Sequence, residues 1–269
     1  MMDEPQIHPA AFVHAGARLG ARTRVGPGAI IDEHVVIGAD CEIRAHAVIT
    51  GHTTLGDGNQ VGYGAVIGAE PQDLAFDPKA VSRVVIGDRN VIREHATIHR
   101  GTKDGTETRL GSGCFLMAEA HVGHNCRIGD RVILASNGLC AGYVDVGDGA
   151  FVSGNAVIHQ FCRMGRLAML RGGGRISKDI PPFMIGDATN RVRGLNVVGL
   201  RRAGIGAAAR AALKRAFHAL FLSGRPMPEV LKELDGDGAT AEVREVVAFI
   251  RASKRGIVAY RGGGEDDGD

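Results

Sequence analysis

A branched or large aliphatic residue occupies nearly every sixth position of the first two-thirds of the chain. The spacing keeps one phase from Ile7 to Ile67, resumes from Ile86 to Ile98, and continues from Leu110 to Ile176. A surface helix would show a period of 3.6 residues, and a surface strand a period of two. A period of six, often with Gly beside the aliphatic residue, is typical of a parallel β-helix in which each hexapeptide forms one strand and one turn. We therefore expect the aliphatic side chains to stack inside as a continuous core.

Three segments interrupt this period. The first lies between Ile67 and Ile86 and contains Pro71 and Pro78, and the second is the polar, glycine-rich stretch Gly101–Arg109. Both are expected to leave the wall as loops, and insertions in solenoids usually collect on the binding face. The third follows Ile180, where two prolines are expected to stop strand propagation.

Helical spacing replaces the period of six after Asn190. Apolar residues recur at helical intervals in Ala207–Phe221, and two more helices are predicted over Met227–Leu234 and Thr240–Ala252, the last with Thr240 as a helix-capping residue. The predicted domains are a β-helix over residues 1–188 and a helical domain over 189–261. Residues 262–269 are rich in Gly, Asp and Glu and are predicted to form a disordered tail.

Composition narrows the class of protein further. The 269 residues include 40 Gly and no Trp, as expected of a coil that turns every few residues, and the net charge of +2 gives no argument for nucleic acid as a partner. The five scattered cysteines, without a CxxC pair, fit reduced thiols better than a disulfide framework. No signal peptide is recognised, and no apolar run approaches the ~20 residues that cross a bilayer. We expect a cytoplasmic protein without stable membrane insertion.

Candidate chemistry is densest in the segment from His121 to Cys126. Three hexapeptides make a coil of 18 residues, so His124, Gly142 and Gln160 are expected to form one column, with His159 in the neighbouring column. A histidine beside a glycine N–H suits acyl transfer, because the imidazole can remove a proton from a hydroxyl while the N–H stabilises an oxyanion. The alternative, that these histidines are solvated turn residues, stays open on spacing alone.

The other histidines are interpreted as solvated turn residues. They are His8, His14, His34, His46, His52, His95, His99 and His218.

A zinc site is the competing interpretation of the histidine cluster. Trimeric β-helices of the gamma carbonic anhydrase class bind zinc with three histidines, and neutral histidine is a common zinc ligand. That class places its later histidine pair five residues apart and within one coil of the first ligand. Here His121 and His124 are three residues apart and His159 lies two coils further on. The spacing favours a site without metal.

Eight motifs together resemble the UDP-N-acetylglucosamine O-acyltransferase family that begins lipid A synthesis. The resemblance extends to about Ile257. The motifs are Gly51–Thr53, Pro71–Leu74, Ile86–Asn90, Ile98–Thr102, His121–Cys126, His159–Phe161, Asp179–Phe183 and Gly194–Arg202. The related N-acyltransferases carry an additional N-terminal uridine-binding domain, whereas this chain starts directly with hexapeptides, so they fit less well.

The resemblance implies a fold, a reaction and a set of site residues. We expect a left-handed parallel β-helix of hexapeptide repeats with a small C-terminal α-helical domain, assembled as a homotrimer. The implied reaction moves a fatty acyl group from acyl carrier protein to the 3-hydroxyl of UDP-N-acetylglucosamine, with no cofactor beyond the carrier's own phosphopantetheine. His124 is the implied general base and Gly142 the oxyanion donor.

The resemblance also assigns the residues that contact substrate. His121 and His159 would position substrate, Gln72 and Asp73 would contact the sugar nucleotide, Gln160, Asn196 and Arg202 would contact substrate or phosphopantetheine, and Gly172 stands where the family measures acyl length.

Three positions depart from the family pattern. Ala75 stands where the family typically has Lys, Tyr143 where it often has His, and Val198 where it often has Glu. All three changes remove ionisable groups around the implied sugar-nucleotide site. A different nucleotide-sugar acceptor is therefore an alternative, as are a metal-dependent enzyme of the carbonic anhydrase type and a scaffold that binds carrier protein without turnover.

A basic stretch supports an acidic protein partner. No Asp or Glu occurs from Ala188 to Pro228. The basic residues there are Arg191, Arg193, Arg201, Arg202, Arg210, Lys214, Arg215 and Arg225. Acyl carrier proteins are strongly acidic, so this stretch is predicted to steer them by charge. The alternative is a solvated helix face.

Overall fold

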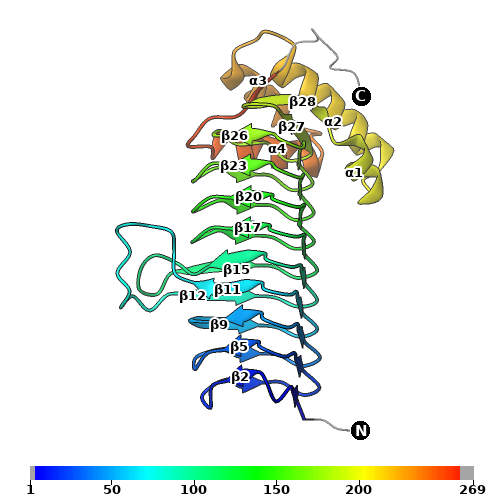
Figure 1. Cartoon of the computed structure of the whole chain (residues 1–269). Helices are drawn as coiled ribbons and strands as arrows, with labels where there is room; N and C mark the ends of the chain where they lie inside the picture. Colours follow the sequence, from blue (N-terminus) through cyan, green and yellow to red (C-terminus); the bar gives the residue numbers. More distant parts are fainter. Residues whose placement is uncertain (1–3, 261–269) are drawn as a thin grey trace.

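The computed structural model describes residues 4–260, and the predicted tail 262–269 lies outside them. The chain winds into a left-handed parallel β-helix with three flat faces and a helical cap at the C-terminal end (Figure 1). Each turn of the chain contributes one short strand to each of three sheets, here called sheets A, B and C. The predicted fold class is confirmed.

The strands of each sheet follow one another up the axis. Sheet A holds β1 (Gln6–Ile7), β4 (Arg24–Val25), β7 (Glu42–Ile43), β10 (Gln60–Val61), β13 (Val91–Ile92), β16 (Phe115–Leu116), β19 (Ile133–Leu134), β22 (Phe151–Val152), β25 (Met169–Leu170), β27 (Met184–Asp187), β28 (Arg191–Leu195) and β29 (Ala259–Tyr260). Sheet B holds β2 (Phe12–Val13), β5 (Ile30–Ile31), β8 (Val48–Ile49), β11 (Val66–Ala69), β14 (Thr97–His99), β17 (His121–Val122), β20 (Leu139–Cys140), β23 (Val157–Ile158) and β26 (Arg175–Ile176). Sheet C holds β3 (Arg18–Leu19), β6 (Val36–Ile37), β9 (His52–Leu55), β12 (Arg83–Ile86), β15 (Glu107–Leu110), β18 (Arg127–Ile128), β21 (Asp145–Val146) and β24 (Arg163–Met164).

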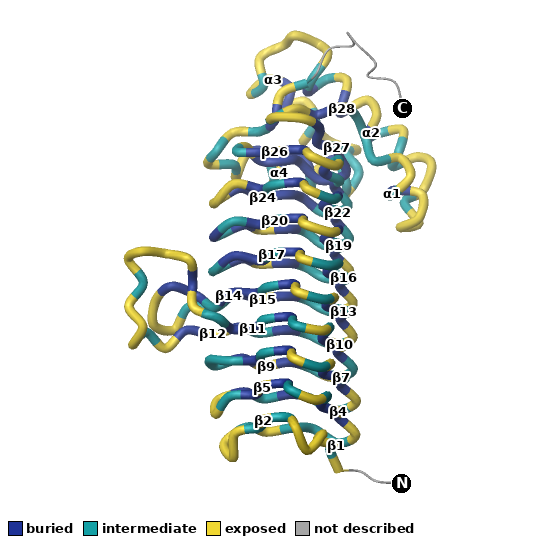
Figure 2. Tube along the Cα trace, in the orientation of Figure 1, coloured by how far each residue is buried: buried dark blue, intermediate teal, exposed yellow. Residues whose placement is uncertain are grey.

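The periodic aliphatic residues form the core, as predicted. Val122 pairs with Cys140, and Cys140 pairs with Ile158, so residues 18 apart stack in one inward column. All three side chains are fully buried. Small residues fill the second inward position of the hexapeptide, for example Ala120 and Cys126. Figure 2 shows this alternation of buried and exposed positions along every coil.

Both predicted insertions leave the wall at the same edge, although the last three residues of the predicted Gly101–Arg109 loop belong to β15 (Glu107–Leu110). Residues 70–82 connect β11 to β12, and residues 100–106 connect β14 to β15, so both loops emerge where sheet B turns into sheet C (Figure 1). We call this the B–C edge, and the edge where sheet A turns into sheet B the A–B edge. The insertions change the residue offset between stacked coils to 31 and then 24 without interrupting the ladder.

Strand pairing continues past Pro181 and Pro182, so the prediction that they stop it is wrong for sheet A. β27 pairs in parallel with β25 and then forms an antiparallel hairpin with β28. The prolines lie in the turn before β27, where no ladder N–H is needed. The hairpin spans the predicted domain boundary at residue 188, which stays a prediction.

Four helices form the cap: α1 (Val197–Arg202), α2 (Ala207–Phe221), α3 (Met227–Leu234) and α4 (Ala241–Arg251). The last three were predicted, with α2 and α3 at the same bounds. Thr240 caps α4, because its side chain accepts a hydrogen bond from the N–H of Val243. The short α1 was not predicted. Buried Asp179 ties the cap to the β-helix, since its carboxylate accepts hydrogen bonds from Arg163 and from Ser253.

Candidate active site

The B–C edge brings the ring of His124 directly against Gly142, one coil further along the axis. A Cβ atom on Gly142 would lie 2.3 Å from Cε1 and 2.5 Å from Nε2 of His124, so only glycine leaves room for this ring. Among residues 4–260 the N–H of Gly142 has no hydrogen-bond acceptor. A basic imidazole and a free N–H therefore lie next to each other, as the column of 18 predicts.

Asn125 orients His124. Its Oδ1 atom lies 3.0 Å from Nδ1 of His124 and also accepts a hydrogen bond from the backbone N–H of Thr102 at 3.1 Å. The backbone N–H can only donate, which identifies the facing amide atom as oxygen. Nδ1 of neutral His124 must then carry the proton, and Nε2 holds the lone pair that a general base needs.

Two further imidazoles pack behind the base. His121 is half-buried with Nδ1 2.7 Å from the hydroxyl oxygen of Thr97, and its ring meets His99 edge to face at 4.9 Å. Burial, and secondly His124, lowers the pKa of His121 below its ordinary value of 6.5. For His99, which is 7% exposed, burial followed by His121 and His124 lowers the pKa to about 4. The interpretation of His99 as a solvated turn residue is wrong, because it ends strand β14 beneath the site.

Tyr143 occupies the turn directly after Gly142 and forms one wall of the site. Its ring stacks on Phe161 at 4.9 Å and meets His124 edge to face at 5.3 Å. A cleft of about 870 Å³ begins beside Asn125, Tyr143 and Phe161 and extends along sheet C to residues 252–255 of the C-terminal segment. The cleft therefore joins the neighbours of His124 to the C-terminal segment.

The remaining predicted residues of the B–C edge lie on either side of the base. His159 and Gln160 are exposed in the turn after β23, and Nδ1 of His159 lies 3.1 Å from the carbonyl oxygen of Gln160. Gln72 and Asp73 are exposed in the loop of residues 70–82, where Asp73 stabilises its own turn by accepting from the N–H of Ala75. All four therefore share one edge with His124.

Three predicted residues lie elsewhere in the chain. Gly172 is exposed in an A–B edge turn, between β25 and β26. Asn196 caps α1 by accepting from the N–H of Gly199 and donates to the carbonyl of Leu167, while Arg202 is exposed at the end of α1. Figure 1 shows α1 and the two loops on opposite sides of the β-helix. One chain does not bring these residues to His124.

Sequence spacing missed Thr102 and the role of Asn125. Thr102 comes from an insertion, so the 18-residue count does not align it with any column. Asn125 directly follows His124, and that adjacency was the one available signal.

The basic stretch of the cap is partly neutralised. Arg193 lies 3.7 Å from the carboxylate of Asp187, and Arg225 lies 2.6 Å from that of Glu233, two acidic residues just outside the stretch. Two of the eight basic residues, Arg193 and Arg225, therefore have an acidic partner. Arg201, Arg202, Lys214 and Arg215 remain exposed, and none of them forms an ion pair with any residue between 4 and 260.

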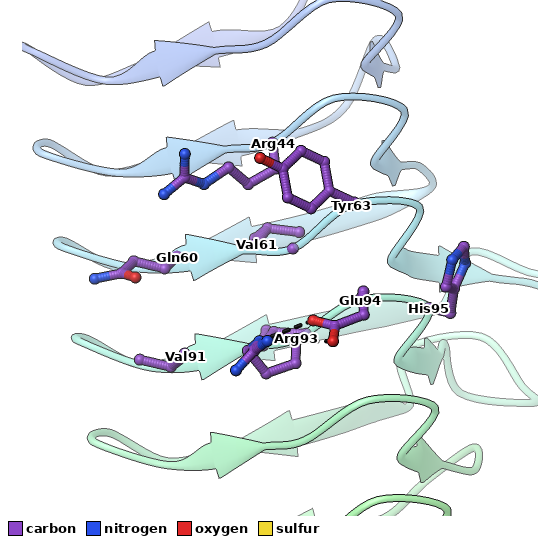
Figure 3. Close-up of a pocket in the computed structure, with 10 residues that line it drawn as sticks. Arg44, Gln60, Val61, Tyr63, Val91, Arg93, Glu94 and His95 are labelled. Atoms are coloured by element: carbon purple, nitrogen blue, oxygen red, sulfur yellow. Dashed lines mark hydrogen bonds and ion pairs between the residues drawn. The ribbon is translucent and has the colours of Figure 1, made fainter.

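A second hollow lies on sheet A, far below the cap. Figure 3 shows its lining side chains, with Arg44 against the ring of Tyr63 and Arg93 paired with Glu94 at 2.8 Å. These side chains interact mainly with one another. Of the histidines gathered at the B–C edge, namely His99, His121, His124 and His159, none lines this hollow.

Between residues 4 and 260, no three His, Cys, Asp or Glu side chains lie together in a way that would hold a metal ion. Within the same range, none of the helices has the length and apolar character needed to cross a membrane.

Comparison with known proteins agrees with the fold. Residues 34–69 and 107–142 match the bacterial transferase hexapeptide family, and residues 179–258 match the family described as UDP N-acetylglucosamine O-acyltransferase, domain 2. The fold and these family matches define an acyltransferase of the hexapeptide-repeat class.

Relatives over the whole length identify the family within that class. The chain is 45% identical to the acyl-[acyl-carrier-protein]–UDP-N-acetylglucosamine O-acyltransferase of Burkholderia orbicola, over 94% of this chain and 99% of that protein. The UDP-N-acetylglucosamine acyltransferase structure from Bacteroides fragilis superposes with a TM-score of 0.90 at 39% identity, covering 94% of this chain and 100% of that one. That from Francisella novicida gives 0.91 at 33% identity, with 96% and 95% covered. The chain belongs to the UDP-N-acetylglucosamine O-acyltransferase family.

Proposed function

We propose that the protein transfers a fatty acyl group, a 3-hydroxyacyl group in the first instance, from acyl carrier protein to the 3-hydroxyl of UDP-N-acetylglucosamine, the first step of lipid A synthesis. The relatives from Burkholderia are acyl-[acyl-carrier-protein]–UDP-N-acetylglucosamine O-acyltransferases, which supports these substrates. The observation that carries the mechanism is the orientation of His124, whose Nδ1 faces Oδ1 of Asn125 and whose ring lies against Gly142.

The reaction follows from this arrangement. Nε2 of His124 removes the proton of the sugar 3-hydroxyl, and the oxygen attacks the carbonyl carbon of the thioester. The N–H of Gly142 donates to the oxyanion that forms. The intermediate then expels the thiolate of phosphopantetheine, which takes the proton back from the imidazolium. No resident metal or organic cofactor enters this sequence, because the thioester carrier supplies the activated acyl group.

The neutral imidazoles behind the base support this role. His121 and His99 have lowered pKa values, so both are uncharged at neutral pH and add no positive charge beside His124. We assign His121 and His159 to positioning of substrate, and Gln72 and Asp73 to contact with the sugar nucleotide. We assign Gln160 to contact with substrate or phosphopantetheine, since it lies one coil beyond Gly142 in the column of His124.

A homotrimer would complete the site. Gly172, Asn196 and Arg202 lie away from His124 within one chain, and a neighbouring copy could bring its A–B edge and cap to the B–C edge of the first. The upper outer face of sheet A supports such contact, because five apolar side chains stack there in one column and would otherwise face solvent. They are Val91, Phe115, Ile133, Phe151 and Met169.

The cap is the proposed docking surface for acyl carrier protein. Arg201, Arg202, Lys214 and Arg215 are exposed and carry no ion pair among residues 4–260. An acidic carrier would be attracted to this surface over a Debye length of about 8 Å at physiological salt. Carrier and sugar nucleotide are both intracellular substrates, which is why we propose the cytoplasm as the location.

Turnover of defined substrates tests the proposal. Purified protein is assayed with UDP-N-acetylglucosamine and carrier proteins loaded with 3-hydroxyacyl or plain acyl chains of several lengths, and the sugar product is identified by mass spectrometry. Substitution His124→Ala should lower kcat by at least ~10²-fold while the assembly and its melting temperature persist. Product from His124→Ala at the wild-type rate would refute the mechanism, and absence of product from the wild type with every carrier would refute the activity.

A further inference from the structure

A continuous chain of hydrogen bonds leads from Tyr143 to the proposed base. The hydroxyl oxygen of Tyr143 lies 3.0 Å from that of Thr102, and the Thr102 hydroxyl lies 3.0 Å from Oδ1 of Asn125. The same oxygen of Asn125 lies 3.0 Å from Nδ1 of His124. All of these distances are within the range of hydrogen bonds.

Hydrogen-bonding capacity fixes the direction of this chain. The backbone N–H of Thr102 donates to Oδ1 of Asn125, so this atom is an acceptor. The Thr102 hydroxyl must then donate to it as well, because two lone pairs would otherwise face each other at 3.0 Å. With its single proton used, the Thr102 oxygen accepts from the hydroxyl of Tyr143. Three donors, including Nδ1–H of His124, therefore converge on one amide oxygen.

The three residues come from three separate parts of the chain. Thr102 belongs to the inserted loop, Asn125 to the turn after β17, and Tyr143 to the turn after β20, so the contact spans the coil that carries His124. Thr102 is only 8% exposed, which shields its hydrogen bonds from competing water. The ring of Tyr143 is held by its stacking on Phe161, so its hydroxyl is aimed at Thr102 before substrate arrives.

We propose that Tyr143 is a positioning residue that acts on His124 through Thr102 and Asn125. Its hydroxyl anchors Thr102, Thr102 anchors the amide of Asn125, and the amide oxygen keeps the proton of His124 on Nδ1. Tyr143 transfers no proton to substrate in this role. The inference rests on the proposed function of His124 as base and adds the group that maintains its reactive tautomer.

The phenol of Tyr143 makes a contact that an imidazole at position 143 would not make in the same way. A histidine is shorter than a tyrosine and carries its polar atoms on the ring, whereas the phenol oxygen of Tyr143 reaches the buried hydroxyl of Thr102. The departure from the family pattern at this position is therefore matched by a contact to the inserted loop.

Single-atom variants test the inference on the full-length assembly. Tyr143→Phe and Thr102→Val each remove one hydroxyl and preserve shape, and each should lower kcat about tenfold, the effect of losing one well-placed hydrogen bond. The KM values for both substrates should change less than twofold. Thr102→Ser keeps the hydroxyl and should retain wild-type kcat, and Tyr63→Phe, in a turn of the A–B edge, serves as the matched control. The double variant should be no slower than either single variant, because both break the same chain.

A spectroscopic measurement tests the tautomer without any substrate. Nitrogen-15 NMR of protein labelled at histidine, with His124 assigned by comparison with His124→Ala, should report the Nδ1–H form in the wild type. In Tyr143→Phe and Thr102→Val a measurable fraction should move to the Nε2–H form. An unchanged tautomer together with unchanged kcat, or full additivity in the double variant, would overturn the inference. If the wild type lacks the proposed transferase activity, the tautomer measurement still tests the inference about Tyr143.

Discussion

The A–B and B–C edges are built from the same turn and carry different chemistry. Gly154 in an A–B turn and Gly142 in a B–C turn occupy the same position, two residues after an inward side chain. An added Cβ on Gly154 would meet only the carbonyl oxygen of Ser136, at 3.4 Å, whereas on Gly142 it would meet the ring of His124 at 2.3 Å. The backbone repeat is therefore neutral with respect to function. The B–C edge becomes a site because three imidazoles and two inserted loops converge there.

Substitution of these two glycines by alanine should give the largest difference in kcat between the two edges. Gly142→Ala should displace His124 and the oxyanion donor, with a loss in kcat of about 10²- to 10³-fold, as for removal of one oxyanion donor. Gly154→Ala should lose at least tenfold less, since its position has room. Steady-state kinetics of acyl transfer, together with melting temperatures, provide the comparison. Similar losses in the two variants would mean that the contact with His124 is unimportant.

Acid should destabilise the B–C edge through His99. Its pKa is about 4 in the folded protein and near 6.5 in the unfolded chain, so the unfolded state binds the extra proton between these values. Stability is therefore complete above pH 6.5 and falls by about 3 kcal/mol as the pH drops to 4.

The matched variants for this effect are His99→Gln and His95→Gln, the second in an exposed A–B turn. Denaturant unfolding at pH 7 and pH 4.5 should show a smaller pH dependence only for His99→Gln. An identical pH dependence in the wild type and His99→Gln would assign the acid sensitivity to other groups.

A lysine at position 75 should strengthen the sugar-nucleotide side of the same edge. Ala75 is exposed in the loop of residues 70–82, where the resemblance predicts a lysine. A charge-assisted hydrogen bond contributes about 1.5–3 kcal/mol, so Ala75→Lys should lower the KM for UDP-N-acetylglucosamine roughly 10- to 100-fold. If the wild type already saturates at low micromolar sugar nucleotide, Lys79 is the alternative cation, and Lys79→Ala should then raise the KM.

Charge reversal on the cap should have the smallest effect. Arg202→Glu or Arg215→Glu should raise the KM for acyl carrier protein severalfold at low salt and less at high salt, because charges at the rim act mainly on the rate of encounter. Arg131→Glu, exposed in a turn below the cap, is the control. Carrier titrations that respond neither to salt nor to charge reversal would exclude the cap as the docking surface.

Periodicity determined what could be predicted, and insertions determined what could not. The period of six predicted the coils and the column of His124 and Gly142, because each strand pairs in register with the strand one coil earlier. The helical spacing predicted α2 and α3, since their buried faces follow the ordinary helical period. His99 and Thr102 escaped, because they flank or belong to an insertion that breaks the 18-residue count. The carboxylates that neutralise part of the cap lie just outside the basic stretch, so composition within the stretch could not reveal them.

The change of offset from 18 to 31 and 24 residues between stacked coils has an evolutionary consequence. The ladder of hydrogen bonds joins the strands, so the strand register does not depend on the length of an inserted loop. The loop of residues 70–82 can therefore vary without altering the strand ladder, whereas Thr102 ties the second loop to Asn125 beside His124. The first loop and the strand ladder can thus change separately under selection.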